Sequence, residues 1–217
     1  MIVEDNENLR ELIRHLLESQ FRIITAEEGQ EAIQLLTEQS VDLVVSDIMM
    51  EGMDGLALCQ WIKNTFEYCH IPVILLTAKH GDSSRIEGYN SGADGYITKP
   101  FSFQVLQARI DNLLKQQDLR SSRYRNQVVI EVEKLDYTSM DEQFLRQAIA
   151  CVNAHIADSS FSRTDFVREM NTSRTVLTEK LKSLTGLTPA AFVLDIRLRA
   201  ARELLEKQRH IRVSDLA

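Results

Sequence analysis

The stretch VDLVVSDIMMEGMDG, residues 41–55, begins as an almost continuous apolar run and ends in a glycine-containing loop. The apolar part is typical of a strand covered on both faces, as in a parallel sheet between two layers of helices. It stops at Asp47, so a carboxylate follows a buried strand. Because ligands bind at the carboxyl ends of parallel strands, Asp47 is a candidate for chemistry.

The residues around this stretch repeat its pattern. Strands are predicted at 1–3, 21–26, 41–46, 71–77 and 94–98, and helices with apolar residues three and four apart at 6–20, 29–39, 55–66, 82–92 and 102–117. Strict alternation of strands and helices implies crossover connections and a doubly wound parallel sheet. The sequence therefore predicts an α/β domain with a five-stranded parallel sheet at residues 1–117.

The pattern changes after this domain. Residues 118–140 are polar and carry mixed charges without a helical stripe, which indicates a linker with a short extended piece at 128–135. From residue 141 to 217 the signal is wholly helical. Helices are predicted at 141–158, 162–170, 173–186 and 189–208, with starts marked by Ser162, Ser173 and Pro189 and a stop at Gly186.

Bulk composition limits the class of protein. No apolar stretch approaches the roughly 18 to 20 residues of a membrane span, and no secretory leader is recognisable, so we expect a soluble cytoplasmic segment without direct membrane contact. The three cysteines lack zinc-site or disulfide spacing. The net charge of −7 is concentrated in the first half, whereas the C-terminal residues are mildly basic, which suggests different partners for the two halves.

Polar residues follow four of the predicted strands. Glu4 and Asp5 follow the first strand, Asp47 the third, Thr77 ends the fourth and Lys99 follows the fifth. These side chains should converge at one edge of the sheet. Three carboxylates and one lysine leave an excess of two negative charges, which a divalent cation would neutralise, and hard oxygen ligands favour Mg²⁺.

This constellation suits chemistry on phosphorus. Asp47 is placed to act as a nucleophile, while Mg²⁺ and Lys99 stabilise the transferring group and Thr77 donates a hydrogen bond to a phosphoryl oxygen. A phosphatase with an aspartyl nucleophile is an alternative, but such enzymes carry a second aspartate two residues later, where this chain has Met49.

Four ordered motifs resemble the receiver domain of two-component response regulators. They are IVEDN at 2–6, VVSDIMMEGMDG at 44–55, VILLTA at 73–78 and DGYITKPFS at 94–102. The resemblance covers residues 1–117 and implies a flavodoxin-like sheet with strand order 2-1-3-4-5. It also implies a phosphoacceptor signalling protein rather than an enzyme.

The resemblance assigns roles to the site residues. It implies that Asp47 accepts phosphate from a histidine kinase, and that Mg²⁺ is surrounded by Glu4, Asp5, Asp47 and the carbonyl of Met49. Thr77 and Lys99 would contact the phosphoryl group.

The resemblance also implies a switch and an output face. Tyr96 matches an aromatic position whose ring turns inward on activation, and Thr77 would act with it. The usual output face corresponds to roughly residues 82–115, so a phosphorylation-biased homodimer is expected.

The basic C-terminal half contains two short helices with a tight connection, as in a helix-turn-helix. The face of the second helix opposite its apolar residues would present Arg174, Thr175, Thr178, Glu179 and Lys182. A helix of this kind can place such residues in the major groove of double-stranded DNA. The alternative interpretation is an ordinary solvated face.

The longer pattern, especially SRTVLTEKLKSLTGLTP at 173–189 followed by RLRAARELL at 197–205, resembles an AraC-type DNA-binding domain. That family carries two helix-turn-helix units. The chain ends within what resembles the second unit, so we expect a truncated domain, weak DNA binding and an origin in a longer protein, such as a hybrid sensor kinase.

The leading hypothesis is thus a transcription regulator controlled by phosphorylation of Asp47. The alternatives are a phosphorelay or protein-interaction module without DNA binding, and the aspartyl phosphatase.

Overall fold

The N-terminal unit is built on a parallel sheet of five strands. The computed structural model describes residues 1–78, 91–127 and 137–207, which fall into the units Met1–Gln117 and Asp118–Ala217. The strand order is β2-β1-β3-β4-β5. The strands are β1 (Ile2–Val3), β2 (Thr25–Ala26), β3 (Val44–Asp47), β4 (Val73–Thr77) and β5 (Gly95–Thr98). This topology confirms the predicted five-stranded parallel sheet and its flavodoxin-like order, although β2 is shorter than the predicted strand at 21–26.

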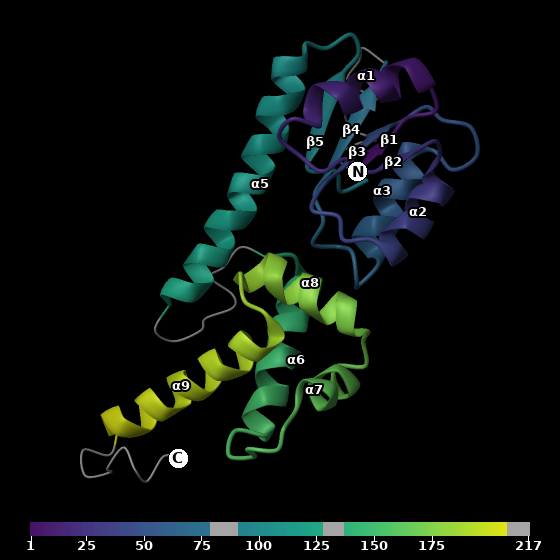
Figure 1. Cartoon of the computed structure of the whole chain (residues 1–217). Helices are drawn as coiled ribbons and strands as arrows, with labels where there is room; N and C mark the ends of the chain where they lie inside the picture. Colours follow the sequence, from purple (N-terminus) through teal and green to yellow (C-terminus); the bar gives the residue numbers. More distant parts are fainter. Residues whose placement is uncertain (79–90, 128–136, 208–217) are drawn as a thin grey trace. The chain divides into compact units, whose positions relative to one another are not determined.

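Helices cover both faces of the sheet (Figure 1). They are α1 (Glu7–Leu17), α2 (Gly29–Glu38), α3 (Gly55–Asn64) and α5 (Phe103–Asn126). Apolar residues of α2 and α3 pack on one face of the sheet, and those of α1 and α5 pack on the other. The predicted helix at 82–92 falls almost entirely outside the described residues.

Local capping explains where two of these helices begin beside the strand ends. The Asn6 side chain accepts a hydrogen bond from the Leu9 amide at 3.0 Å, and that of Asp54 accepts one from the Ala57 amide at 2.7 Å. Such caps satisfy amides that have no partner within the helix. The chain therefore turns into α1 directly after Glu4 and Asp5, and into α3 shortly after Asp47.

The strand register aligns the carboxyl ends of the strands. Val3 pairs with Ser46 of β3, and Asp47 pairs with Leu76 of β4. Thr77 in turn pairs with Thr98 of β5. Residues that follow β1, β3, β4 and β5 consequently lie along the same edge of the sheet.

The C-terminal unit is helical among its described residues. It contains α6 (Ser139–Ala154), α7 (Arg163–Glu169), α8 (Arg174–Thr185) and α9 (Pro189–Lys207). Its core includes the fully buried rings of Phe144, Phe166 and Phe192, the last two with centroids 6.2 Å apart. The predicted start and stop signals act as expected, since Ser162 and Ser173 cap α7 and α8 and Gly186 ends α8 in the left-handed conformation, with φ of 72°.

The turn between α7 and α8 is tight. Asn171 has a positive φ of 48°, and the Thr172 amide donates to the Val167 carbonyl at 3.4 Å. Asparagine tolerates the left-handed region better than most residues, which allows the chain to reverse within a few residues. The second helix then starts at Arg174.

The segment after residue 117 differs from the sequence expectation. Residues 118–126, which lack a helical stripe, form the last turns of α5. Tyr124 anchors these turns to the C-terminal unit. Its ring is fully buried there and stacks on the Phe192 ring, with the ring centroids 6.2 Å apart. The extended piece predicted at 128–135 and the last residues, 208–217, lie outside the described residues. In the described part of the chain, no helix has the length and apolar character needed to cross a membrane.

Candidate functional site

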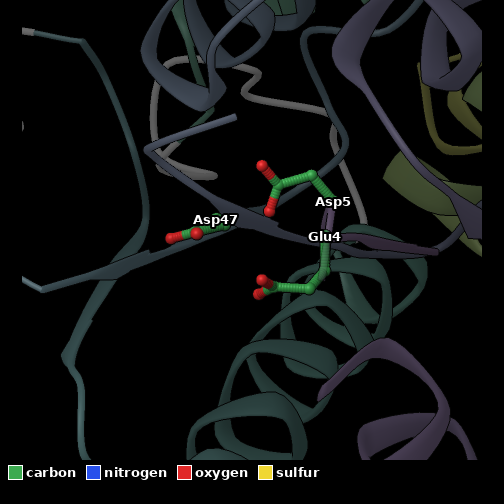
Figure 2. Close-up of side chains that lie close together, drawn as sticks. All are labelled: Glu4, Asp5 and Asp47. Atoms are coloured by element: carbon green, nitrogen blue, oxygen red, sulfur yellow. The ribbon is translucent and has the colours of Figure 1, made fainter. Parts of the chain in front are cut away.

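Three carboxylates meet at the carboxyl edge of the sheet. Glu4 and Asp5 follow β1 and Asp47 ends β3, and one carboxylate oxygen from each lies within 4.8 Å of the others (Figure 2). Glu4 and Asp47 are 1% and 7% exposed, whereas Asp5 is exposed to solvent. The cluster therefore has a buried floor and one open side.

Lys99 joins two of these carboxylates. Its Nζ lies 2.8 Å from Glu4 Oε2 and 2.9 Å from Asp47 Oδ2. A single ammonium group between buried carboxylates reduces their repulsion but leaves the cluster negative. The arrangement thus retains an attraction for a further cation.

The environment shifts two of these pKa values. Burial raises the pKa of Glu4, and the nearby charges of Asp47 and Asp5 add to this effect, although the hydrogen bond from Lys99 opposes it. For Lys99, burial acts to lower the pKa, but the hydrogen bonds and charges of Glu4 and Asp47 outweigh it and raise the pKa. Lys99 is therefore a permanent cation at neutral pH.

The backbone after β3 fixes the position of Asp47. The Ile48 amide donates to Asp47 Oδ1 at 2.8 Å, and the carbonyl of Asp47 faces the start of α3. A Cβ on Gly55 would lie 1.9 Å from that carbonyl oxygen, so only glycine allows this approach. Gly55, the last residue of the opening stretch, thus lets α3 begin against the strand that carries Asp47.

Arg10 supports the site from α1, and sequence reasoning missed it. Its guanidinium donates to the Glu4 carbonyl at 2.7 Å and to Glu27 Oε1 at 2.8 Å, and the residue is only 8% exposed. It lies on the same buried stripe of α1 as Ile13 and Leu17. An arginine three residues before an apolar stripe position could have signalled this role.

The other predicted site residues differ in burial and in contacts. Thr77 is buried at the end of β4, and its carbonyl accepts from the Lys99 amide at 2.6 Å. The peptide bond between Lys99 and Pro100 is cis. Met49 follows Asp47 by two residues with a 61% exposed side chain. The Tyr96 hydroxyl lies 3.5 Å from Ser91 Oγ, among residues that pack on the α3 side of the sheet.

The donor set fits a hard divalent cation. Carboxylate oxygens within a few ångströms of one another, with one side open to water, are the ligands that Mg²⁺ prefers. Cysteine and histidine, the ligands expected of a zinc site, are absent from this group of three.

In the C-terminal unit, the predicted DNA-contacting face divides by exposure. Arg174, Thr175 and Lys182 are exposed, while Thr178 and Glu179 are half-buried. Arg163 of α7 donates to the Thr178 hydroxyl at 3.2 Å, so this threonine bridges the two helices.

Comparison with known proteins agrees with the geometry of the N-terminal unit. The sequence model of the response regulator receiver domain family matches residues 1–111 of the chain. The chain belongs to the response regulator receiver family. The crystal structure of a signal receiver domain of a signal transduction histidine kinase from Syntrophus aciditrophicus is 37% identical, with a TM-score of 0.50 over 52% of this chain and 87% of that chain. A Francisella receiver domain is 32% identical, with the same TM-score over 53% of this chain and 94% of its own.

Longer relatives extend beyond the receiver domain. Histidine kinase P4 of Formosa agariphila is 36% identical over 217 residues, which are 100% of this chain and 16% of that protein. Heme response regulator HssR of Staphylococcus haemolyticus is 32% identical over 74% of this chain and 67% of its own length. Transcriptional regulatory protein GltR of Pseudomonas aeruginosa is 33% identical over 64% of this chain and 58% of its own length. The chain thus spans about one sixth of the first of these relatives.

Proposed function

We propose that this chain is a phosphoacceptor signalling protein in which Asp47 receives a phosphoryl group from a histidine kinase. The observation that carries the proposal is the convergence of Glu4, Asp47 and Lys99 at one sheet edge, with Lys99 within 2.9 Å of both carboxylates. Membership of the receiver family supports the same acceptor role.

In the proposed reaction, a carboxylate oxygen of Asp47 forms a bond to phosphorus. The bond between phosphorus and the donor nitrogen breaks, and its electron pair stays on the imidazole of the donor. Glu4, Asp5, Asp47 and the Met49 carbonyl would hold Mg²⁺, which neutralises charge on the transferring group when bound. Lys99 then moves from the Asp47 carboxylate to a phosphoryl oxygen, and Thr77 donates a second hydrogen bond.

An apolar groove beside Lys99 suits the docking of a kinase helix. It is lined on one side by α1 and on the other by the segment after β5, with Leu12 at 54% and Leu16 at 37% exposed. An amphipathic helix binds such a groove through its apolar face. Docking here would bring a phosphohistidine next to Lys99 and Asp47.

We further propose that the helical unit is an AraC-type DNA-binding domain controlled by the receiver. The tight turn at Asn171 and the exposed cations Arg174 and Lys182 on α8 support this assignment. A relative named a transcriptional regulatory protein supports a role in transcription, not the AraC type itself. Phosphorylation would act through the receiver surface formed by β5 and α5, and a homodimer through that surface is part of the proposal.

The match with Histidine kinase P4 favours a particular context. It covers the receiver and the helical unit together, within a much longer protein. We propose that this pair of units works in a hybrid sensor, in the same polypeptide as a kinase. A phosphorelay module without DNA binding is the alternative function for that context.

The experiment that tests the acceptor role compares intact masses after incubation with acetyl phosphate and Mg²⁺. The wild type should gain one phosphoryl group, and Asp47→Asn should not. Asp54→Asn is a matched control, because asparagine caps helices as well as aspartate and Asp54 lies outside the cluster. Unchanged labelling of Asp47→Asn would refute the acceptor assignment.

DNA binding by the helical unit has its own test. Fluorescence anisotropy with duplex DNA should show weak binding that falls as salt rises, because phosphate contacts dominate the affinity. Arg174→Ala should weaken binding, whereas Arg202→Ala, an equally large loss of charge at an exposed residue of α9, should not. If both variants weakened binding equally, the binding would be explained by general charge attraction and not by a specific contact of α8.

A further inference from the structure

A short chain of contacts links Tyr96 to α3. Tyr96 is half-buried in β5, and its hydroxyl lies 3.5 Å from the hydroxyl of Ser91. The Ser91 hydroxyl lies 3.8 Å from Cys59 Sγ, and the Cys59 thiol donates to the Ser91 carbonyl at 3.5 Å. Ser91 is 3% exposed and Cys59 is fully buried, so the contact between Ser91 and Cys59 is shielded from water.

The segment that carries Ser91 is anchored independently of Tyr96. Lys63 of α3 forms an ion pair with Asp94 Oδ2 at 2.7 Å, and the Val73 amide of β4 donates to the same oxygen at 2.8 Å. The Asp94 amide donates in turn to the Val73 carbonyl at 2.9 Å. Ser91 is therefore held in place on the α3 side whether or not Tyr96 contacts it.

The contact between the Ser91 and Tyr96 hydroxyls is weak enough to restrain Tyr96 reversibly. Hydroxyl pairs normally bond at about 2.7–2.8 Å, so a separation of 3.5 Å indicates a weak hydrogen bond that is easily exchanged. Burial raises the pKa of Cys59, which keeps its thiol protonated and able to donate to the Ser91 carbonyl. The contacts thus favour one orientation of Tyr96 without locking it.

We propose that Ser91, held by Cys59, is a positioning residue that keeps the Tyr96 side chain in its present orientation and opposes its movement on phosphorylation. The inference rests on the proposed acceptor role of Asp47 and on a Tyr96 movement coupled to it. An interaction made in only one of two states shifts the equilibrium toward that state. Loss of the Ser91 hydroxyl should therefore make the phosphorylated conformation easier to reach.

The chain contains a natural reporter for this equilibrium. Trp61 is its single tryptophan, and both Trp61 and Tyr96 pack against the apolar cluster on the α3 side of the sheet. Beryllium fluoride with Mg²⁺ is a suitable probe, because it imitates a phosphoryl group on a carboxylate without being hydrolysed. Trp61 fluorescence gives the half-saturating concentration of this probe for the full chain.

The test is a double-mutant cycle with Ser91→Ala, Tyr96→Phe and the double variant. Ser91→Ala should lower the half-saturating concentration by about two- to fivefold, the size of a weak hydrogen bond. In the Tyr96→Phe background, the same substitution should have no effect, because the hydroxyl that Ser91 contacts is gone. A purely structural role of Ser91 would persist in that background and would overturn the proposal.

Cys59→Ala provides a second variant if Ser91→Ala does not fold, which thermal unfolding would reveal. It should shift the half-saturating concentration in the same direction, and the shift should again vanish with Tyr96→Phe. If the wild type responds to beryllium fluoride and the Ser91 and Cys59 variants have the same half-saturating concentration, the positioning role is refuted but the acceptor role is not. A wild type that responds no more than Asp47→Asn would refute the acceptor role, and the positioning role with it.

Discussion

Lys180 is fully buried on α8 and lies 3.1 Å from Asp141 of α6, so an ion pair joins the helix of the proposed DNA contact to the core of its unit. The ammonium group also lies 5.3 Å from the centre of the Phe144 ring. Asp141 in addition accepts from the Thr138 hydroxyl at 2.8 Å. The pair therefore fixes how α8 is rotated about its own axis, which decides which of its residues face solvent.

Removing one partner of this pair should be strongly destabilising. Lys180→Ala removes a buried cation that lies 3.1 Å from the carboxylate of Asp141, and we expect a loss of about 3–5 kcal/mol in the free energy of unfolding. Urea denaturation followed by circular dichroism measures this loss. Fluorescence of Trp61, which lies in the other unit, should show an unchanged transition.

The double variant Lys180→Met with Asp141→Leu is the control for this interpretation. It removes both charges and replaces them with apolar groups, so most of the lost stability should return. A double variant as unstable as Lys180→Ala would show that packing volume, rather than the loss of the ion pair, sets the effect.

Gly55→Ala should damage the site through the backbone. The new methyl group would meet the Asp47 carbonyl, so either α3 or the end of β3 must shift, at a cost of about 1–3 kcal/mol. We expect phosphoryl labelling by acetyl phosphate to fall sharply together with the melting temperature. Gly186→Ala, strained by a φ of 72° in the other unit, should lower stability but leave labelling intact.

The raised pKa of Glu4 predicts how stability depends on pH without metal. Between the usual value of 4.5 and the raised value, the folded state holds a proton on Glu4 that the unfolded state releases. The contribution of Glu4 is thus fully present below 4.5 and is lost as pH rises through the raised pKa. Unfolding free energies measured in EDTA should show this decline, and Glu4→Gln should flatten it.

Saturating Mg²⁺ should reverse that trend. Bound metal needs the ionised carboxylate, so the stabilisation by Mg²⁺ should grow as pH rises through the same window. The difference between unfolding free energies with Mg²⁺ and with EDTA measures it. A difference that is independent of pH would argue that Glu4 is not a ligand.

Substitutions at two exposed residues, Leu12 and Val105, should affect kinase docking and self-association independently. Leu12→Asp in the groove should slow phosphoryl transfer from a histidine kinase severalfold but leave labelling by acetyl phosphate unchanged. Val105→Asp, equally exposed at 54% on α5, should leave transfer unchanged but weaken the proposed homodimer. Transfer rates and sedimentation velocity give the two readouts, and the pattern would fail if either variant impaired both.

Much of the receiver unit could be predicted because its signals are local. The buried strands β3 and β4 read as apolar runs, and Asn6 and Asp54 mark the starts of the helices that follow β1 and β3. The convergence of Glu4, Asp47 and Lys99 followed from the parallel topology, since parallel strands end at a common edge.

The missed features depend on partners that are distant in the chain. The end of α5 is polar apart from Tyr124 and the exposed Leu119, and only the stacking of the Tyr124 ring on Phe192 shows why this end belongs to a core. The sequence gives no sign that Lys180 is buried, because its partner Asp141 is 39 residues away along the chain. Arg10 was hidden for a different reason, since its main partner, the Glu4 carbonyl, is a backbone group that no side-chain pattern reveals.

The contact between Glu4 and Lys99 joins residues 95 positions apart in the chain. During synthesis, the first carboxylate leaves the ribosome long before the lysine that completes the cluster. On the proposed acceptor role of Asp47, the cluster that receives phosphate is therefore incomplete until β5 has been made and has joined the sheet. The proposed ability to accept phosphate would then report that the N-terminal unit has finished folding.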